Sequence, residues 1–192
     1  MAQTAKRAAT YEDLLAVPEP RVAEILFGEL VTHPRPAAPH VITASALLQV
    51  LGPPFQAGIG GPGGWIFAVE PELHLDQHVA VPDLAAWRLQ RLSALPKTAW
   101  FGVAPDWVCE LLSPSTERYD RGDKRLIYAE AGVAHAWYVN PVLRMLEAYE
   151  LREGKWVTLD VFFDAEEVKA PPFIDISFPA NRLWPLDPSP EE

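Results

Sequence analysis

Apolar residues recur along this chain with two different periods, and each period predicts one kind of element. From Val41 to Leu51, apolar side chains return every three or four residues, which is the period of a helix, and Gly52 is expected to end it. A shorter helix is predicted after Thr10, whose hydroxyl can cap it. The stretch "TERYDRGDKRLIYAEAG" predicts another helix, ended by Gly132.

Alternation at every second residue predicts strands in the remaining segments. The predicted strands form hairpins around Phe27-Gly28, Asp76-Gln77 and Glu153-Gly154, and "DWVCELL" and "HAWYVNP" are expected to be single strands. This order predicts an α/β fold, a mixed β-sheet flanked by helices with additional β-hairpins. It also predicts one domain over residues 10–184, with flexible tails at 1–9 and 185–192.

The composition narrows the classes of protein to which this chain can belong. The chain has 192 residues, and 26 acidic against 16 basic side chains give a net charge of −10, the wrong sign for holding nucleic acid by bulk electrostatics. A single cysteine, Cys109, excludes an internal disulfide and a cysteine zinc site. No apolar run is long enough for a membrane span, and no signal-peptide pattern is visible. A soluble cytoplasmic protein is therefore expected.

Two carboxylates fall where apolar residues are expected. Glu110 stands in the middle of "WVCELL", and Asp83 follows Pro82 in a strand where Val79 and Val81 share its predicted face. A buried carboxylate costs several kcal/mol unless a partner compensates it. If the two strands pair, both acids can point into one cleft, where Mg²⁺ or Mn²⁺ would suit their hard oxygen ligands.

Simpler interpretations of these acids stay open at this point. Glu110 can form a half-buried ion pair with Lys124 or Arg125, a common source of false site predictions. Asp83 after a proline can be only a turn former. Asp120, Lys124 and Tyr128 are spaced four apart, so they are expected to share one helix face, on which Tyr128 is either a core residue or orients the lysine.

Three stretches together carry a family resemblance: "VPDLAAW", "VCELLSPST" and "DRGDKRLIYAEAGVAHAWYVNP". They resemble the Uma endonuclease-like family of bacterial proteins, which has the restriction-endonuclease-like fold of the PD-(D/E)XK superfamily. The resemblance implies that Asp83 and Glu110 bind a divalent metal, Mg²⁺ or Mn²⁺. It also implies a lysine two residues after the glutamate that assists the attacking water, but Leu112 occupies that place.

The resemblance further implies that the lysine has moved from the strand to the helix, where Lys124 is the candidate. His40 stands at the start of the first long helix, where many superfamily members carry a glutamate, so it becomes a catalytic candidate, although alone it is more often a capping or surface residue. Glu29 is a further family-like acid that is expected to reach the cleft.

Two functions of different class follow. One is a metal-dependent endonuclease that hydrolyses phosphodiester bonds of nucleic acid, with a homodimer as a family-level expectation. The alternative is an inactive nuclease-fold module that acts in binding or oligomerisation. Some roles are expected for residues outside the acid pair: phosphate contacts or an ordinary solvated helix face for Arg118, Arg121 and Arg125, surface positions for His74 and His78, and helix capping for Ser113, Ser115 and Thr116.

Overall fold

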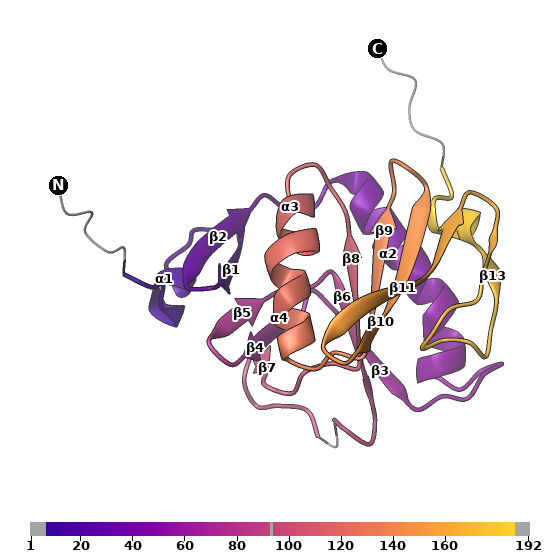
Figure 1. Ribbon diagram of the computed structural model, residues 1–192, viewed down its shortest axis with the longest axis horizontal. Coiled ribbons are helices and arrows are strands. Elements are labelled where there is room, and N and C mark those ends of the chain that lie inside the picture. The colour runs from indigo at the N-terminus through magenta and orange to yellow at the C-terminus, as the bar shows by residue number, and fades with distance from the viewer. Residues whose placement is uncertain (1–6, 93, 187–192) are drawn as a thin grey trace, which may run out of the picture.

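The computed structural model describes residues 7–92 and 94–186. Its longest helices are α2 and the continuous helical run from α3 through η2 to α4 (Figure 1). In chain order the elements are α1 (Tyr11–Leu15), β1 (Val22–Leu26), β2 (Glu29–His33), α2 (Ala38–Leu51), η1 (Gly52–Gln56), β3 (Trp65–Val69), β4 (Glu72–Leu75), β5 (His78–Ala80), β6 (Leu84–Arg88), β7 (Trp100–Phe101), β8 (Trp107–Leu111), α3 (Glu117–Tyr119), η2 (Asp120–Lys124), α4 (Arg125–Glu130), β9 (His135–Asn140), β10 (Met145–Arg152), β11 (Lys155–Phe163), β12 (Glu167–Val168), β13 (Phe178–Pro179) and η3 (Ala180–Leu183).

The strands form two larger sheets and one small ribbon. The central sheet has the order β11-β10-β9-β8-β6-β3, and its β8–β9 pair is parallel while its other pairs are antiparallel. The second sheet has the order β2-β1-β5-β4-β7, and β12 pairs with β13. Helix α2 lies on one face of the central sheet and α4 on the other (Figure 1). The mixed α/β fold with additional hairpins is therefore confirmed.

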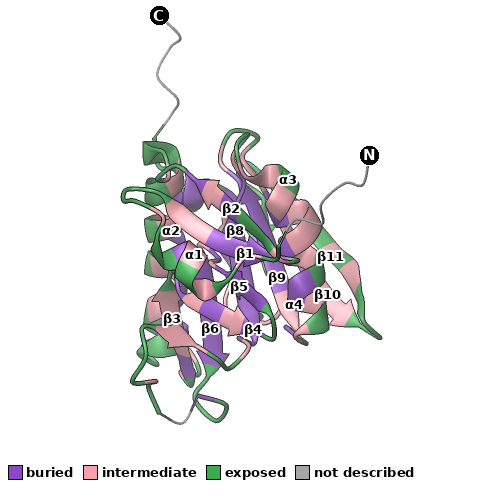
Figure 2. Ribbon diagram, turned by 90° about the vertical axis from the view of Figure 1, so that its left-hand side faces the viewer, coloured by how far each residue is buried: buried purple, intermediate pink, exposed green. Residues whose placement is uncertain are grey.

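Strand β8 divides the core by the two-residue period of a strand. Trp107, Cys109 and Leu111 pack in the cluster that contains α2, whereas Val108 packs with Ile127 of α4. Figure 2 shows β8 as a wholly buried strand in the middle of the molecule. The period puts Glu110 on the α4 side, so its carboxyl group faces the space between the central sheet and that helix.

Prolines split the predicted hairpin around Asp76-Gln77 between the two sheets. Near the turn, β4 pairs with β5 in the second sheet; farther out, β3 pairs with β6 in the central sheet. Pro71 and Pro82 lie at the breaks, where a residue without an N–H interrupts the ladder. The predicted alternation from Val79 through Val81 to Asp83 is therefore wrong, because Asp83 precedes β6 outside any strand.

Gly52 does not end the helical path, because it keeps right-handed dihedrals and opens the π-helix η1. Thr10 is the N-cap of α1, as predicted, and the structure adds a capping box between Thr10 and Asp13. Most of the predicted tails, 1–9 and 185–192, lie outside the described residues, but the Ala9 N–H donates to the Gly28 carbonyl at 2.8 Å. No helix within the described ranges is long and apolar enough to cross a membrane.

Candidate functional site

The pairing of β6 with β8 brings the two predicted acids together. Leu84 stands opposite Cys109 in this antiparallel pair, so one further step of the register places Asp83 opposite Glu110. Both side chains line the same pocket, which has a volume of about 360 Å³. Lys124 and His40 line it as well. The structure thus gathers all four predicted site residues around one cavity.

Asp83 is held from two sides. Its Oδ2 accepts the Leu111 N–H at 2.7 Å, which ties the carboxylate to the end of β8. Its Oδ1 lies 2.6 Å from Nε2 of His40, in the first turn of α2. His40 therefore neither caps the helix nor faces open solvent; it bridges α2 and the acid. The two side chains are 17% and 13% exposed, so they form the accessible part of the cluster.

Glu110 lies deeper, with only 1% of its surface exposed. Its Oε1 accepts the Tyr128 hydroxyl at 2.5 Å and lies 2.9 Å from Nζ of Lys124. Burial raises the pKa of Glu110 well above the ordinary value; the charges of Asp120 and Asp83 raise it further, against the attraction of Lys124. Tyr128 is thus a buried residue that orients the glutamate.

Lys124 is a buried cation surrounded by acids. Its Nζ lies 2.9 Å from Glu110, 3.2 Å from Asp120 and 3.4 Å from Glu24, and it donates to the Val81 carbonyl at 3.0 Å. Burial alone would lower the pKa of Lys124, but these carboxylates raise it well above its usual range. Three acidic side chains therefore share one ammonium.

Glu24 is the member of this cluster that the sequence reasoning missed. Only 1% exposed, it accepts the Val81 N–H at 2.7 Å and contacts His33 at 3.0 Å. Burial alone would raise the pKa of Glu24, but Lys124 and these two partners lower it below the ordinary value. The available signal was the one used for Glu110, a single carboxylate in an apolar run, here "VAEIL".

Glu29, the acid expected to reach the cleft, does not line the pocket. It lies opposite Leu26 beside the turn of the β1–β2 hairpin and is exposed. The expectation was wrong because the register of this hairpin places Glu29 at its tip, whereas Glu24 is paired with Val31 in the middle of β1.

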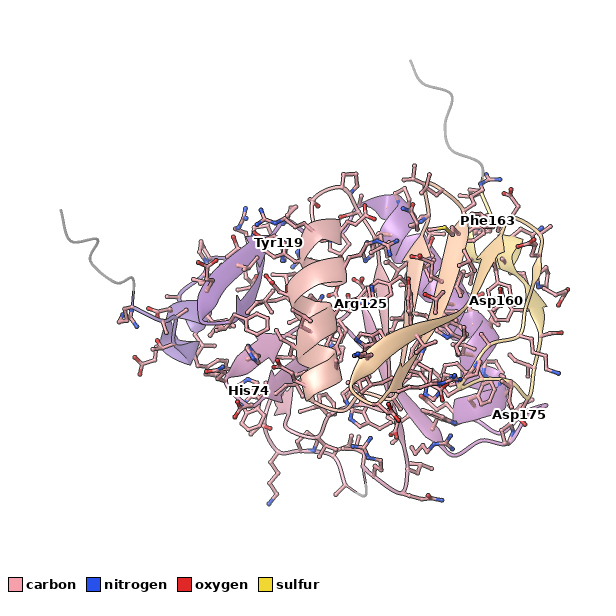
Figure 3. The ribbon with its side chains drawn as sticks, in the orientation of Figure 1. His74, Tyr119, Arg125, Asp160, Phe163 and Asp175 are labelled. Atoms are coloured by element: carbon pink, nitrogen blue, oxygen red, sulfur yellow. The ribbon has the colours of Figure 1, made fainter. Side chains whose placement is uncertain are left out.

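The helix arginines are engaged away from the pocket. Arg121 pairs with Glu117 and with Glu147 of β10. Arg125 lies over the Tyr149 ring at 4.6 Å, on the side of the helix that faces β10 and β11 (Figure 3). Arg118 is exposed, but the described lining of the pocket includes none of these three arginines. The arginine that does line it is Arg35, in the loop between β2 and α2.

Two further sequence expectations changed. His78 is buried, not on the surface, because the β4–β5 turn packs against the β1–β2 turn and its Nδ1 accepts the Phe27 N–H at 3.1 Å. The hydroxyl of Ser113 bonds to those of Ser115 and Thr116 at 2.9 and 3.0 Å, and Thr116 makes no side-chain capping bond. These hydroxyls line the pocket instead of capping the helix.

Asp83 and Glu110 are the candidate ligands for a divalent cation in this pocket. Within residues 7–92 and 94–186, no group of three or more His, Cys, Asp or Glu side chains is arranged to hold a metal ion. Mg²⁺ does not require such a group, since it is commonly held by one or two carboxylates together with water and substrate phosphate. Asp83 and Glu110, which line one pocket, fit that pattern.

Comparisons with known proteins agree with this fold. Residues 8–181 match the Uma2 family, described as "Putative restriction endonuclease". A solved structure described as a "putative nuclease belonging to DUF820", from Anabaena variabilis, superposes with a TM-score of 0.71 at 21% identity, over 92% of this chain and 98% of that chain. Among curated proteins, none matches significantly. Because the family match spans most of the sequence, this protein belongs to the Uma2 family.

Proposed function

We propose that this protein is a metal-dependent nuclease that hydrolyses phosphodiester bonds of nucleic acid. The observation that carries the proposal is the meeting of Asp83, Glu110 and Lys124 in one pocket, although they come from a loop, a strand and a helix that are separate in sequence. Carboxylates and a lysine around one cavity are the groups that phosphodiester hydrolysis requires, because negative charge must be stabilised and a water must be activated.

Asp83 and Glu110 are the residues that would hold Mg²⁺ or Mn²⁺. When bound, such an ion makes a coordinated water more acidic and offsets the charge of the scissile phosphate. The chain's own contribution is to keep the two carboxylates in place. His40 and the Leu111 N–H hold Asp83, and the Tyr128 hydroxyl holds Glu110.

Lys124 takes the role of the lysine that the strand lacks at Leu112. Its neighbours Glu24 and Asp120 keep the ammonium protonated and aimed at Glu110. A protonated lysine there can orient the attacking water or offset phosphate charge; it cannot serve as the base that removes the proton. His40 is partly exposed and contacts Asp83, so it positions that carboxylate and borders the place where the phosphate would enter.

The experiment is a cleavage assay on a panel of nucleic acids with Mn²⁺ or Mg²⁺. Replacing Asp83 with Asn or Glu110 with Gln should lower the rate by at least about 100-fold. Glu29→Gln is the matched control, since it removes an exposed acid outside the pocket and should cleave at the wild-type rate. Cleavage that persists in both site variants would refute the proposal.

Two observations favour a second function, an inactive module that uses this fold for binding or oligomerisation. In the described ranges no group of three or more His, Cys, Asp or Glu side chains is arranged to hold a metal ion, and Leu112 occupies the place of the strand lysine. Absence of cleavage on every substrate, together with no Mn²⁺ binding by calorimetry, would favour that function. A homodimer and a cytoplasmic location stay predictions, which light scattering and cell fractionation can test.

A further inference from the structure

The reactive groups of the site lie at the bottom of their pocket and not on an open surface. Glu24, Glu110, Asp120 and Lys124 are buried, whereas Asp83 and His40 are partly accessible. A phosphate must therefore pass the rim of the cavity to approach Glu110. This depth limits which forms of nucleic acid can reach the acids.

Short, proline-rich segments form the walls. One is the loop from Pro34 to Ala37 before α2, and another runs from Ser113 to Thr116 after β8; Val142 adds an apolar wall after β9. The pocket volume of about 360 Å³ lies at the lower end of the range of about 300–1,000 Å³ typical of small-molecule pockets. A cavity of this size encloses a unit of one strand, not the width of a duplex.

Stiffness sharpens this limit. Duplex DNA has a persistence length of about 50 nm, and bending a site of about 20–30 base pairs by about 40–90° costs about 1–6 kcal/mol, so a closed duplex resists following the pocket walls down to Glu110. An unpaired strand rotates freely about its backbone and meets no such cost.

The basic residues that line the pocket indicate which side chain can contact the nucleic-acid strand. Arg35 and Lys124 are the arginine and lysine among the described residues that line the pocket. Lys124 is already enclosed by three carboxylates. Arg35 is exposed, and within the described part of the chain no hydrogen bond or ion pair is seen for its guanidinium. It is therefore free to contact a backbone phosphate at the mouth.

We propose that the pocket accepts a single strand of DNA or RNA, or an unpaired end of a duplex, with Arg35 binding a backbone phosphate at the entrance. This inference rests on the proposed nuclease function and narrows it to a substrate class. Because one exposed arginine makes the contact on an otherwise acidic protein, few counterions are released and binding depends only weakly on salt.

Binding is the deciding measurement, since it does not require cleavage. Labelled single-stranded DNA, single-stranded RNA, a closed duplex and a duplex with an unpaired flap are titrated by anisotropy into the Asp83→Asn protein with Mg²⁺. We expect the unpaired strands and the flap to bind at least tenfold more tightly than the closed duplex; the two strand types show whether sugar chemistry matters. Equal or tighter binding of the closed duplex, or no binding of any strand, would overturn the inference.

Arg35→Ala in the same background tests the contact. It should weaken strand binding and make the slope of log affinity against log salt shallower by about 0.7, the value for one phosphate on a single strand. Arg118→Ala is the matched control, an exposed arginine outside the pocket, and should change neither. If Arg118→Ala has the effect and Arg35→Ala does not, the assigned entrance is wrong.

Cleavage by the wild-type protein separates this inference from the proposed function. Cleavage of closed duplex as fast as of unpaired strands overturns the substrate class and leaves the nuclease intact. Binding of single strands that depends on Arg35, without cleavage of any substrate, upholds the substrate class and removes the nuclease.

Discussion

Strands β1 and β8 each bury one glutamate, yet the two acids behave in opposite ways. Glu24 and Glu110 are both 1% exposed and both contact Lys124. The pKa of Glu24 is nevertheless lowered, whereas that of Glu110 is raised. Glu24 also accepts the Val81 N–H and contacts His33, while Glu110 has the charges of Asp83 and Asp120 nearby.

The difference shows that burial alone does not decide the charge state of a site. At Glu24, hydrogen bonds and a cation offset the loss of hydration, so the carboxylate stabilises the fold. At Glu110, neighbouring acids add to the cost of burial, so the ionised carboxylate is destabilised and a further cation beside it would stabilise it. A metal ion is one cation that could bind there. Glu24 of β1 would then keep Lys124 in place.

The largest expected effect comes from removing the cation that both glutamates share. Lys124→Met leaves Glu24, Glu110 and Asp120 buried without their ammonium, so the free energy of unfolding at pH 7 should fall by about 3–5 kcal/mol. Denaturation with urea measures this loss. Lys155→Met, at an exposed lysine of β11, is the control and should stay within about 0.5 kcal/mol of wild type.

The second-largest effect is a change in the free energy of unfolding that should differ in sign between variants of the two glutamates. Glu24→Gln should lower the free energy of unfolding by about 1.5–3 kcal/mol, because it removes a charge-assisted hydrogen bond and a partner of Lys124. Glu110→Gln should leave stability unchanged or raise it, since Lys124 keeps two acids and the repulsion with Asp83 ends. Urea denaturation at pH 7 decides; equal losses in both variants would contradict the comparison.

A smaller effect concerns divalent metal. Mg²⁺ at ten times its dissociation constant should stabilise the wild type by about 1.4 kcal/mol, because it binds only the folded protein. Glu24→Gln should keep this gain and Glu110→Gln should lose it, since Glu110 is the proposed ligand. Thermal melts with and without Mg²⁺ provide the measurement. A metal-dependent shift that survives in Glu110→Gln would place the ion elsewhere.

The smallest expected effect concerns His135, a histidine whose pKa is shifted mainly by burial. Burial lowers the pKa of His135, at the start of β9, and the charge of Arg88 adds to this, against Glu150 and Asp106. The unfolded state therefore binds more protons than the folded state, so stability falls as the pH drops below about 6.5 toward the lowered pKa. His135→Gln should reduce this loss in melts between pH 8 and 5, with little change at pH 8. An unchanged pH dependence would show that other groups cause it.

Local patterns were sufficient for most elements of this fold. The helical period of α2, the N-cap at Thr10 and the turns at Phe27-Gly28 and Glu153-Gly154 depend on neighbours within a few residues, which the sequence displays directly. The isolated carboxylate in "WVCELL" identified Glu110 for the same reason. The same rule applied to "VAEIL" would have identified Glu24.

What only the tertiary structure decided is how these elements meet. The sequence could not show that the hairpin around Asp76-Gln77 is shared between two sheets, that the β6–β8 register puts Asp83 opposite Glu110, or that Arg35 and not the helix arginines borders the pocket. A strand period specifies which face a side chain takes but not the neighbouring strand or its register. Those are chosen by the burial of side chains far apart in the chain, so the cluster around Lys124 exists only once both sheets and α4 have packed.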